Sequence, residues 1–198
     1  YLHKDKQLGT HSQKFMKMIQ HIFNSPGTCF VYSQFYQAEG IGIFALTLQA
    51  HGYIEYGYKD PEFNQDNVMK PFPYTIDSVT NKRWDKCNEK EKQNFTPLTY
   101  IKWTDIRDTH GRHVINIFNN DENKYGKFIK VFLATKSGAE GINLMNVRQV
   151  HLMEPYWHDV LTEQAMARAI RRCSHVSLPP EERNVSVFRY ISTHHKYP

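Results

Sequence analysis

Three polar side chains in the carboxyl-terminal third of the sequence have the types and the spacing to bind a phosphate group. Gln164, Arg168 and Arg171 recur at positions i, i+4 and i+7, which on one helix would place an amide and two guanidiniums on a single face. Arginine binds phosphate through a planar fork and keeps its charge, so such a pair could clamp a terminal phosphate and stabilise charge during its transfer. The spacing alone also fits a solvated basic face of a helix.

A run of small residues upstream, from Thr135 to Gly141, has the composition of a turn that approaches a ligand. Gly138 and Gly141 permit tight turning and let a phosphate come close to backbone N–H groups. Thr135, Lys136 and Ser137 can donate hydrogen bonds to a nucleic-acid backbone, which positions a strand without reading its sequence. A plain structural turn is the other interpretation of these residues.

Two strands and a helix must position these side chains. The β-branched and aromatic residues of Ile129–Ala134 predict a buried strand, a second strand is predicted at Val147–Leu152, and a helix is predicted over Asp159–Arg172. Strand, loop, strand and helix at this spacing indicate part of a parallel α/β sheet. Ligands of such sheets bind beyond the carboxyl ends of the strands, where we expect Thr135–Gly138 and Glu154–Trp157 to lie.

The rest of the sequence predicts further elements of the same kind, and one region that differs. Further strands are predicted at Thr28–Tyr32, Tyr53–Tyr58, Tyr100–Trp103 and Val185–Ile191, and further helices behind a Ser12 cap and at Ala38–His51 and Gly111–Phe118. Residues 59–98 are rich in Asn, Asp, Lys, Glu and Pro and predict an insertion or a long surface loop. Within it, Trp84 and its basic neighbours could grip a nucleic-acid strand, although an exposed loop is the more common role of such a cluster.

Composition narrows the possible functions. Of the 198 residues, 40% are hydrophobic and 14% aromatic, which favours a globular fold over a disordered chain. The formal charge of +5 fits an anionic partner. Three cysteines without paired spacing favour a reducing, intracellular compartment. No apolar run approaches the roughly 18 residues of a membrane span, and a first residue of Tyr1 instead of Met predicts a piece of a longer protein.

The turn and the helix together resemble motifs V and VI of superfamily 2 helicases and translocases, most closely the Swi/Snf-like branch. The residues that match its pattern are Thr135, Gly138, Glu140, Gly141, Asn143, Leu144, Trp157, Gln164, Arg168 and Arg171. The phrases VHLMEPYW and SHVSLPPEERNVSVFRYI resemble helicases of large nucleocytoplasmic DNA viruses, a group that includes the poxvirus early transcription factor small subunit and related nucleoside triphosphatases. Ala167 departs from the family, where glycine is common; a helix tolerates the change.

The resemblance implies a fold and a set of site residues. The implied fold is a helicase carboxyl-terminal, RecA-like domain over residues 1–198, an α/β three-layer sandwich whose central sheet is mostly parallel. Arg168 and Arg171 match the arginines that reach the triphosphate, and Gln164 matches a residue that links the nucleotide to the other motifs. The matching motif V hinge consists of Gly138, Glu140, Gly141 and Asn143. Ser33 and Gln34 match motif IV, whose loop faces nucleic acid; the polar exit of an ordinary strand explains them equally well.

The implied activity is that of an ATP-dependent DNA helicase or translocase, in which this chain supplies arginine fingers to ATP bound by a first RecA-like lobe. That lobe would hold the phosphate loop and the Mg²⁺ ligands, and because no G-x-x-x-x-G-K-[ST] motif occurs here, we expect the fragment alone to be inactive. The implied partners are DNA phosphates, the first lobe and a viral RNA polymerase, and the implied setting is viral transcription in the host cytoplasm or the virion. A non-catalytic DNA- or protein-binding module of a transcription complex is the alternative.

Overall fold

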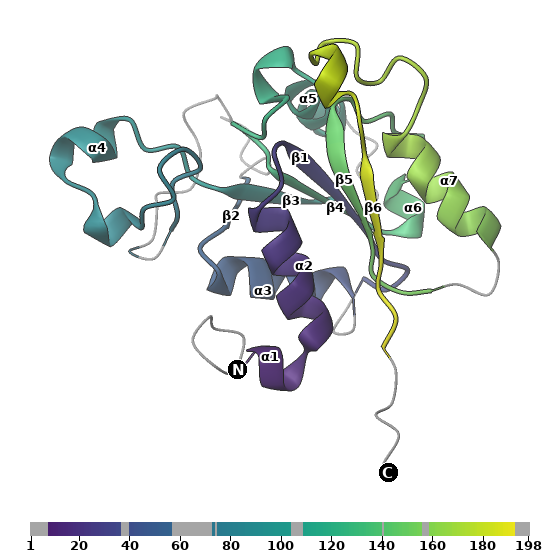
Figure 1. Ribbon diagram of the computed structural model, residues 1–198, viewed down its shortest axis with the longest axis horizontal. Coiled ribbons are helices and arrows are strands. Elements are labelled where there is room, and N and C mark those ends of the chain that lie inside the picture. The colour runs from purple at the N-terminus through teal and green to yellow at the C-terminus, as the bar shows by residue number, and fades with distance from the viewer. Residues whose placement is uncertain are drawn as a thin grey trace.

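A six-stranded parallel sheet forms the centre of the structure. The computed structural model describes residues 8–36, 40–56, 73, 75–103, 109–139, 141–155 and 159–192. The strand order is β2-β3-β4-β1-β5-β6, and each neighbouring pair is parallel. The strands are β1 Thr28–Tyr32, β2 Ile54–Glu55, β3 Thr99–Trp103, β4 Val131–Ala134, β5 Val147–Leu152 and β6 Ser186–Arg189 (Figure 1). All six predicted strands are thus present, and the predicted parallel sheet is confirmed.

Short helices connect these strands. The α-helices are α1 Leu8–His11, α2 Gln13–Phe23, α3 Ile41–Ala50, α4 Glu89–Gln93, α5 Thr109–Phe118, α6 Lys136–Ala139 and α7 Asp159–Ala169, and the 3₁₀ helices are η1 Trp84–Lys86, η2 Asp121–Asn123 and η3 Pro180–Glu182. Ser12 caps α2 as predicted, because its side chain accepts a hydrogen bond of 3.2 Å from the Phe15 N–H. In the described part of the chain, no helix has the length and apolar character needed to cross a membrane.

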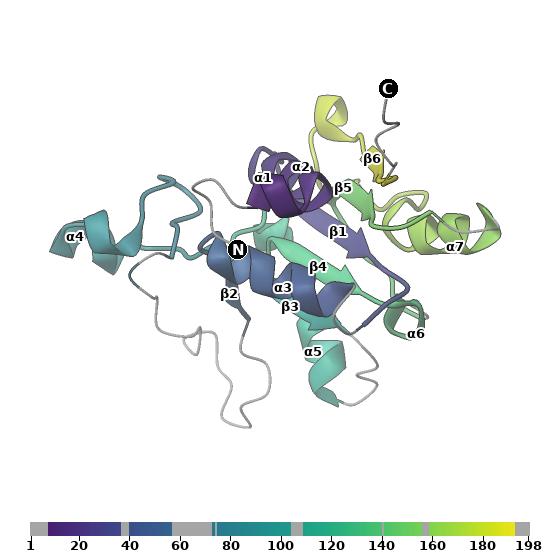
Figure 2. The same cartoon turned by 90° about the horizontal axis from the view of Figure 1, so that it is seen from below.

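Side chains along the central strands alternate between the two faces of the sheet, and both faces are buried. Phe30 and Phe132 point to the face covered by α5, α6 and α7, whereas Val31 and Leu133 point to the face covered by α1, α2 and α3. Parallel strands covered by helices on both sides read as continuous apolar runs, and all residues of β1, β4 and β5 are buried. Figures 1 and 2 show the resulting three layers, which confirm the predicted sandwich.

Phe132 lies at the centre of one core, so its truncation should be costly. The ring is fully buried, with centroids 5.1 Å from Phe118, 5.6 Å from Trp103 and 6.3 Å from Phe30. We expect Phe132→Ala to lower the free energy of unfolding by about 3–5 kcal/mol, because the cavity adds to the lost burial. Urea unfolding measures the change. The matched control is Phe35→Ala, since that ring is 49% exposed; an equal loss in both variants would contradict the prediction.

Residues 75–98 are more ordered than the predicted surface loop. The Asp77 carboxylate accepts hydrogen bonds of 2.7 Å from the Thr80 N–H, the Thr80 hydroxyl and the Thr96 N–H. Asn88 and Glu91 form a capping box at α4, which lies away from the sheet in both views (Figures 1 and 2). Local hydrogen bonds stabilise this segment, and they leave no periodic pattern of apolar residues by which a helix or strand could be predicted.

The basic cluster around Trp84 is largely engaged within this segment. The indole ring packs edge-on against Phe95, with centroids 4.9 Å apart. The cations on either side have carboxylate partners: Lys82 pairs with Glu91, and Arg83 lies 2.9 Å from Asp85. Trp84, Lys82 and Arg83 thus have partners within the segment, whereas Lys86 is exposed.

Candidate nucleotide and nucleic-acid site

The carboxyl ends of three adjacent strands bring together residues that are far apart in the sequence. Strand β1 lies between β4 and β5, so the residues that follow these strands meet at one edge of the sheet. Ser33 follows β1, Thr135 follows β4 and Glu154 comes shortly after β5, and the Ser33 N–H donates to the Ala134 carbonyl at 3.1 Å. The predicted placement of the Thr135 turn and Glu154 at strand ends is confirmed.

Ser33 is part of the interior of this edge and does not face solvent. Its side chain is fully buried, and its hydroxyl lies 3.0 Å from a carboxylate oxygen of Glu154. The other oxygen of Glu154 accepts a 3.3 Å hydrogen bond from the Gln34 N–H. The prediction that Ser33 contacts nucleic acid is therefore corrected, since a buried hydroxyl has no surface for such a contact; the residue holds the loop after β1 to Glu154.

Burial also changes the proton affinity of Glu154. Partial removal from water raises the pKa of its carboxyl above the ordinary value of 4.5, against the lowering effects of the Ser33 hydroxyl, the Gln34 N–H and Lys14. The carboxylate at this edge is thus held by the two chain segments that it joins, and is not a free acidic group. The sequence placed Glu154 at a strand end but did not indicate this role.

The turn after β4 presents two polar side chains to solvent. Lys136 and Ser137 are exposed at the start of α6, while Thr135 is only 6% exposed, with its hydroxyl 3.3 Å from that of Ser137. Gly138 is buried, and its carbonyl accepts a 2.8 Å hydrogen bond from the Trp103 indole N–H. The buried Trp103 side chain thus fixes the turn on its inner side. Lys136 and Ser137 are the exposed members of the predicted nucleic-acid set, and Gln34 is partly exposed.

The chain then runs from this edge towards the end of α7. Gly141 has a φ of 80° and is exposed, a conformation that favours glycine. The Asn119 amide brackets the next residues: it donates to the Asn143 carbonyl and accepts from the Met145 N–H, both at 2.8 Å. Between them, the Leu144 N–H donates to the Arg168 carbonyl at 3.0 Å. The two predicted motifs are therefore joined through their backbones. Glu140 lies outside the described residues.

Helix α7 packs on the sheet through small residues and leaves its polar ones outside. Ala165 and Ala169 are buried, Gln164 is exposed and Arg168 is half-buried. The helix starts after the carboxyl end of β5 and runs back towards the amino ends of the strands (Figure 1). Arg168 therefore lies at the end of α7 remote from Glu154, and segment 141–145 connects the two regions.

Arg171 lies beyond the helix, which corrects one prediction. Helix α7 ends at Ala169, so Arg171 does not share a helical face with Gln164 and Arg168. A turn through Cys173, whose φ is 65°, reverses the chain, and the Ser174 N–H donates to the Arg171 carbonyl at 3.1 Å. The Leu144 N–H binds one of the last helical carbonyls, which helps to end the helix there. The Arg171 side chain is exposed.

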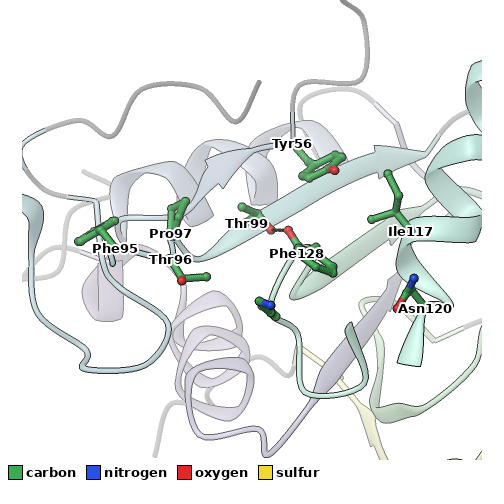
Figure 3. Close-up of a pocket in the computed structure, with 9 residues that line it drawn as sticks. Tyr56, Phe95, Thr96, Pro97, Thr99, Ile117, Asn120 and Phe128 are labelled. Atoms are coloured by element: carbon green, nitrogen blue, oxygen red, sulfur yellow. Dashed lines mark hydrogen bonds between the residues drawn. The ribbon is translucent and has the colours of Figure 1, made fainter. Parts of the chain in front are cut away.

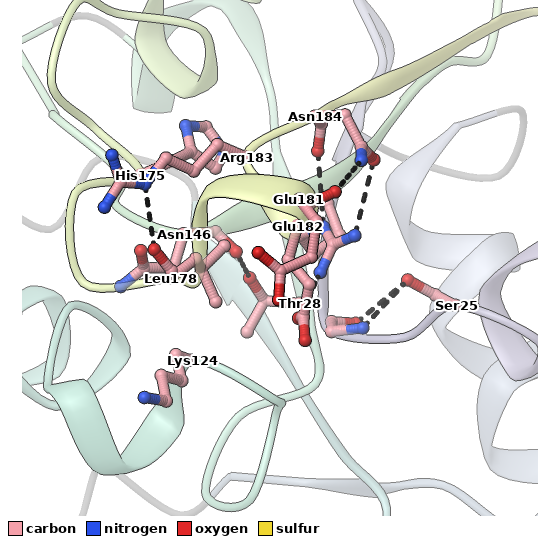
Figure 4. A network of polar contacts seen from close by, with 12 residues as sticks. Ser25, Thr28, Lys124, Asn146, His175, Leu178, Glu181, Glu182, Arg183 and Asn184 are labelled. Atoms are coloured by element: carbon pink, nitrogen blue, oxygen red, sulfur yellow. Dashed lines mark hydrogen bonds and ion pairs between the residues drawn. The ribbon is translucent and has the colours of Figure 1, made fainter.

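The segment after Arg171, residues 174–184, is attached to the amino end of β5. The Asn146 N–H donates to the Ser174 carbonyl at 2.9 Å, and the Thr28 hydroxyl donates to the Asn146 carbonyl at 3.0 Å. The buried Arg148 lies 2.9 Å from Glu182 and donates to the Asn184 carbonyl at 3.2 Å. Figure 4 shows the polar network around Asn146, Glu182 and Asn184. These contacts fix the backbone that follows the two arginines.

Comparisons with known proteins agree with this geometry. Residues 78–173 match the family described as helicase conserved C-terminal domain. The match covers just under half of the chain. A mimivirus protein of Acanthamoeba polyphaga, named "Putative ATP-dependent RNA helicase R563", is 32% identical over 93% of this chain and 26% of its own length. An African swine fever virus protein, named "Termination factor NPH-I homolog", is 33% identical over 96% of this chain and 27% of its own length.

The fold of the chain is RecA-like. The crystal structure of the C-terminal part of the Fun30 ATPase domain matches 94% of this chain and 43% of that one, with a TM-score of 0.53 and 14% identity, which concerns the fold alone. The matches confirm the resemblance to superfamily 2 helicases and to those of large DNA viruses. The chain spans about a quarter of the length of the curated relatives it matches.

A pocket elsewhere on the chain is separate from these motifs. It encloses about 200 Å³ between β3, the end of α5 and residues 95–97. Figure 3 shows Tyr56, Thr99, Ile117, Asn120 and Phe128 among the residues around it. None of the predicted site residues lines this pocket, so we do not place the nucleotide or the nucleic acid there.

Sequence reasoning missed two groups of residues near these motifs. Asn119 positions residues 143–145, but an asparagine after a helix has no distinctive local pattern. Phe35 and Tyr36 are 49% and 52% exposed beside the carboxyl edge, and their carbonyls accept hydrogen bonds of 3.0 and 2.9 Å from the N–H groups of Ile41 and Gly42. Adjacent aromatics after a buried strand could have suggested this exposed pair.

Proposed function

We propose that residues 1–198 form the second motor lobe of an ATP-dependent DNA helicase or translocase. The observation that carries this proposal is that the side chains of Arg168 and Arg171 have no ion-pair partner in the described ranges although their backbones are held in place by hydrogen bonds. A guanidinium on a fixed backbone and without a counter-charge is suited to a polyanionic ligand.

The residues at the end of α7 fit the triphosphate of ATP bound by a first lobe. Arg168 and Arg171 would bind phosphate oxygens, and Gln164, which is exposed one turn before Arg168, would add an amide contact. When bound, ATP with Mg²⁺ supplies the phosphoryl group that is transferred to water, and the metal ligands are expected on the first lobe. Arg171 would stabilise the charge that develops on the phosphate oxygens in the transition state. Gly138, Gly141 and Asn143 would link that site to the nucleic-acid edge.

The exposed groups at the carboxyl edge would contact the nucleic-acid backbone. Lys136 and Ser137 offer an ammonium and a hydroxyl, and the backbone N–H of Gln34 is taken by Glu154, which leaves its side chain for such a contact. Phe35 and Tyr36 offer aromatic faces on which bases could stack. Contacts of this kind bind phosphate and sugar and do not read sequence.

Replacing Lys136 with alanine should weaken nucleic-acid binding in a salt-dependent way. Each phosphate contact contributes about −0.9 to the slope of log K against log salt for duplex DNA, so the variant should lose about one such unit. Fluorescence anisotropy of the full-length protein at several salt concentrations measures the slope. Lys90→Ala, which removes an exposed lysine on α4, is the matched control. Wild-type binding that survives an approximately fourfold rise in salt unchanged would contradict the proposal.

The names of the relatives suggest a setting. One is named for RNA and another as a homolog of a termination factor. We propose a role in viral transcription beside a viral RNA polymerase, within the infected host cell or the virion. ATP hydrolysis by the full-length protein, measured with duplex DNA, single-stranded DNA and RNA in turn, tests the substrate. No hydrolysis with any of them would favour a non-catalytic binding module instead.

A further inference from the structure

Ser174 contacts both the backbone nitrogen and the backbone carbonyl of Arg171. Its hydroxyl oxygen lies 3.3 Å from the Arg171 nitrogen and 2.8 Å from the Arg171 carbonyl oxygen. The Ser174 N–H also donates to that carbonyl at 3.1 Å. Ser174 is only 2% exposed, so its contacts are made in the interior while the Arg171 side chain extends outside.

His175 connects Ser174 to the sheet. The His175 Nε2 lies 2.7 Å from the Val147 carbonyl, and its Nδ1 lies 2.8 Å from the Ser174 hydroxyl. A carbonyl can only accept, so Nε2 carries a proton and donates to Val147. The Ser174 hydroxyl donates to the Arg171 carbonyl and accepts from the Arg171 N–H. The Arg171 carbonyl also accepts from the Ser174 N–H.

These contacts link Arg171 to the sheet through Ser174 and His175. The Ser174 hydroxyl binds the backbone of Arg171, the His175 Nδ1 lies beside that hydroxyl, and the His175 Nε2 donates to the Val147 carbonyl, where β5 begins. The turn between them contains Cys173 in the left-handed region, a conformation that costs a non-glycine residue about 1–2 kcal/mol. These hydrogen bonds hold the turn against its own strain.

We infer that Ser174 and His175 are positioning residues that fix the Arg171 guanidinium relative to the sheet. The inference rests on the proposed function, in which Arg171 acts on the phosphate. Arg171 has left the helix, so α7 does not set its direction, and these hydrogen bonds take over that task. A misplacement of about 1 Å in a group that acts in the transition state can cost roughly 100-fold in rate.

The test compares Ser174→Ala with a serine of the same segment that does not touch Arg171. Ser177 donates to the Asn146 side chain at 3.0 Å, so Ser177→Ala removes a similar hydrogen bond. In the full-length protein, we expect Ser174→Ala to lower kcat for ATP hydrolysis by about 100-fold with little change in KM. Ser177→Ala should keep the wild-type kcat. Thermal melting of both variants measures any shared loss of stability.

A second readout isolates the transition state. We expect Ser174→Ala to weaken binding of ADP with aluminium fluoride, a transition-state mimic, in proportion to kcat, and to leave binding of ADP alone unchanged. If Ser174→Ala does not fold, His175→Phe, which keeps a ring but removes both nitrogens, takes its place with the same expectation. Equal kcat losses in the Ser174 and Ser177 variants, or equal weakening of both ligands, would overturn the inference.

The outcomes separate this inference from the proposed function. An Arg171→Ala variant with normal hydrolysis would refute the role of Arg171, and the positioning role with it. An inactive Arg171→Ala variant beside fully active Ser174→Ala and His175→Phe variants would refute only the positioning role.

Discussion

Replacing Arg171 with alanine in the full-length protein is expected to lower kcat for ATP hydrolysis by about 10³- to 10⁵-fold, the range that an arginine finger contributes to phosphoryl transfer. This corresponds to roughly 4–7 kcal/mol of transition-state stabilisation. The side chain is exposed and has no ion pair within the described ranges, and on the Arg171 side the hydrogen bonds to Ser174 use only backbone atoms. Alanine retains those bonds, so the free energy of unfolding should change by no more than about 0.5 kcal/mol.

Arg172 provides the matched control for this experiment. It is the same residue type, it is also exposed, and it matches no motif position. Steady-state ATPase assays of Arg171→Ala and Arg172→Ala, with urea unfolding of both, separate loss of a catalytic charge from loss of a general positive charge. Near-normal hydrolysis in the Arg171 variant, or an equal loss in both, would refute the assignment.

Acid should destabilise the chain through His151, with a large effect. His151 is fully buried, and its Nδ1 lies 2.8 Å from the Tyr190 hydroxyl while its Nε2 lies 3.1 Å from the Gln149 side-chain oxygen. Burial first, and then the neighbouring His21, lower its pKa from 6.5 to about 3. The unfolded chain therefore takes up a proton as the pH falls below about 6.5, whereas the folded chain does not until about 3.

Stability contributed by the neutral ring is thus complete above pH 6.5 and is lost as the pH falls towards about 3. The full loss amounts to roughly 3–5 kcal/mol. Glu154 acts in the opposite sense: its raised pKa favours the folded state as the pH falls through the range just above 4.5, but its partial exposure makes that contribution smaller. The net expectation is a marked acid destabilisation.

Urea unfolding at about pH 8 and about pH 5 measures this dependence. His151→Gln keeps a donor and an acceptor but has no ring to protonate, so its free energy of unfolding should change much less between the two conditions. His113→Gln, which changes an exposed histidine on α5, should retain the wild-type dependence. An unaltered pH dependence in His151→Gln would show that another group is responsible.

The strands and the motif order could be predicted because their signals are local. The runs of β1 and β4 are short and almost entirely apolar, and a small polar residue follows each of them. Residues 75–98 were predicted less well. Their order comes from Asp77 binding Thr96 and from capping of α4, and neither produces an apolar period.

The amino-acid sequence by itself determined that parallel strands alternate with helices, and that a glycine-containing turn and two arginines follow them in helicase order. Only the tertiary structure decided what each polar group faces. Ser33 and Glu154 are 121 positions apart, and their contact buries a residue whose type and neighbours indicated a surface role. Arg171 left the helix because Leu144, Ser174 and the start of β5 bind the chain there. Side-chain type and period are local properties, whereas burial and hydrogen-bond partners depend on which segments the sheet brings together.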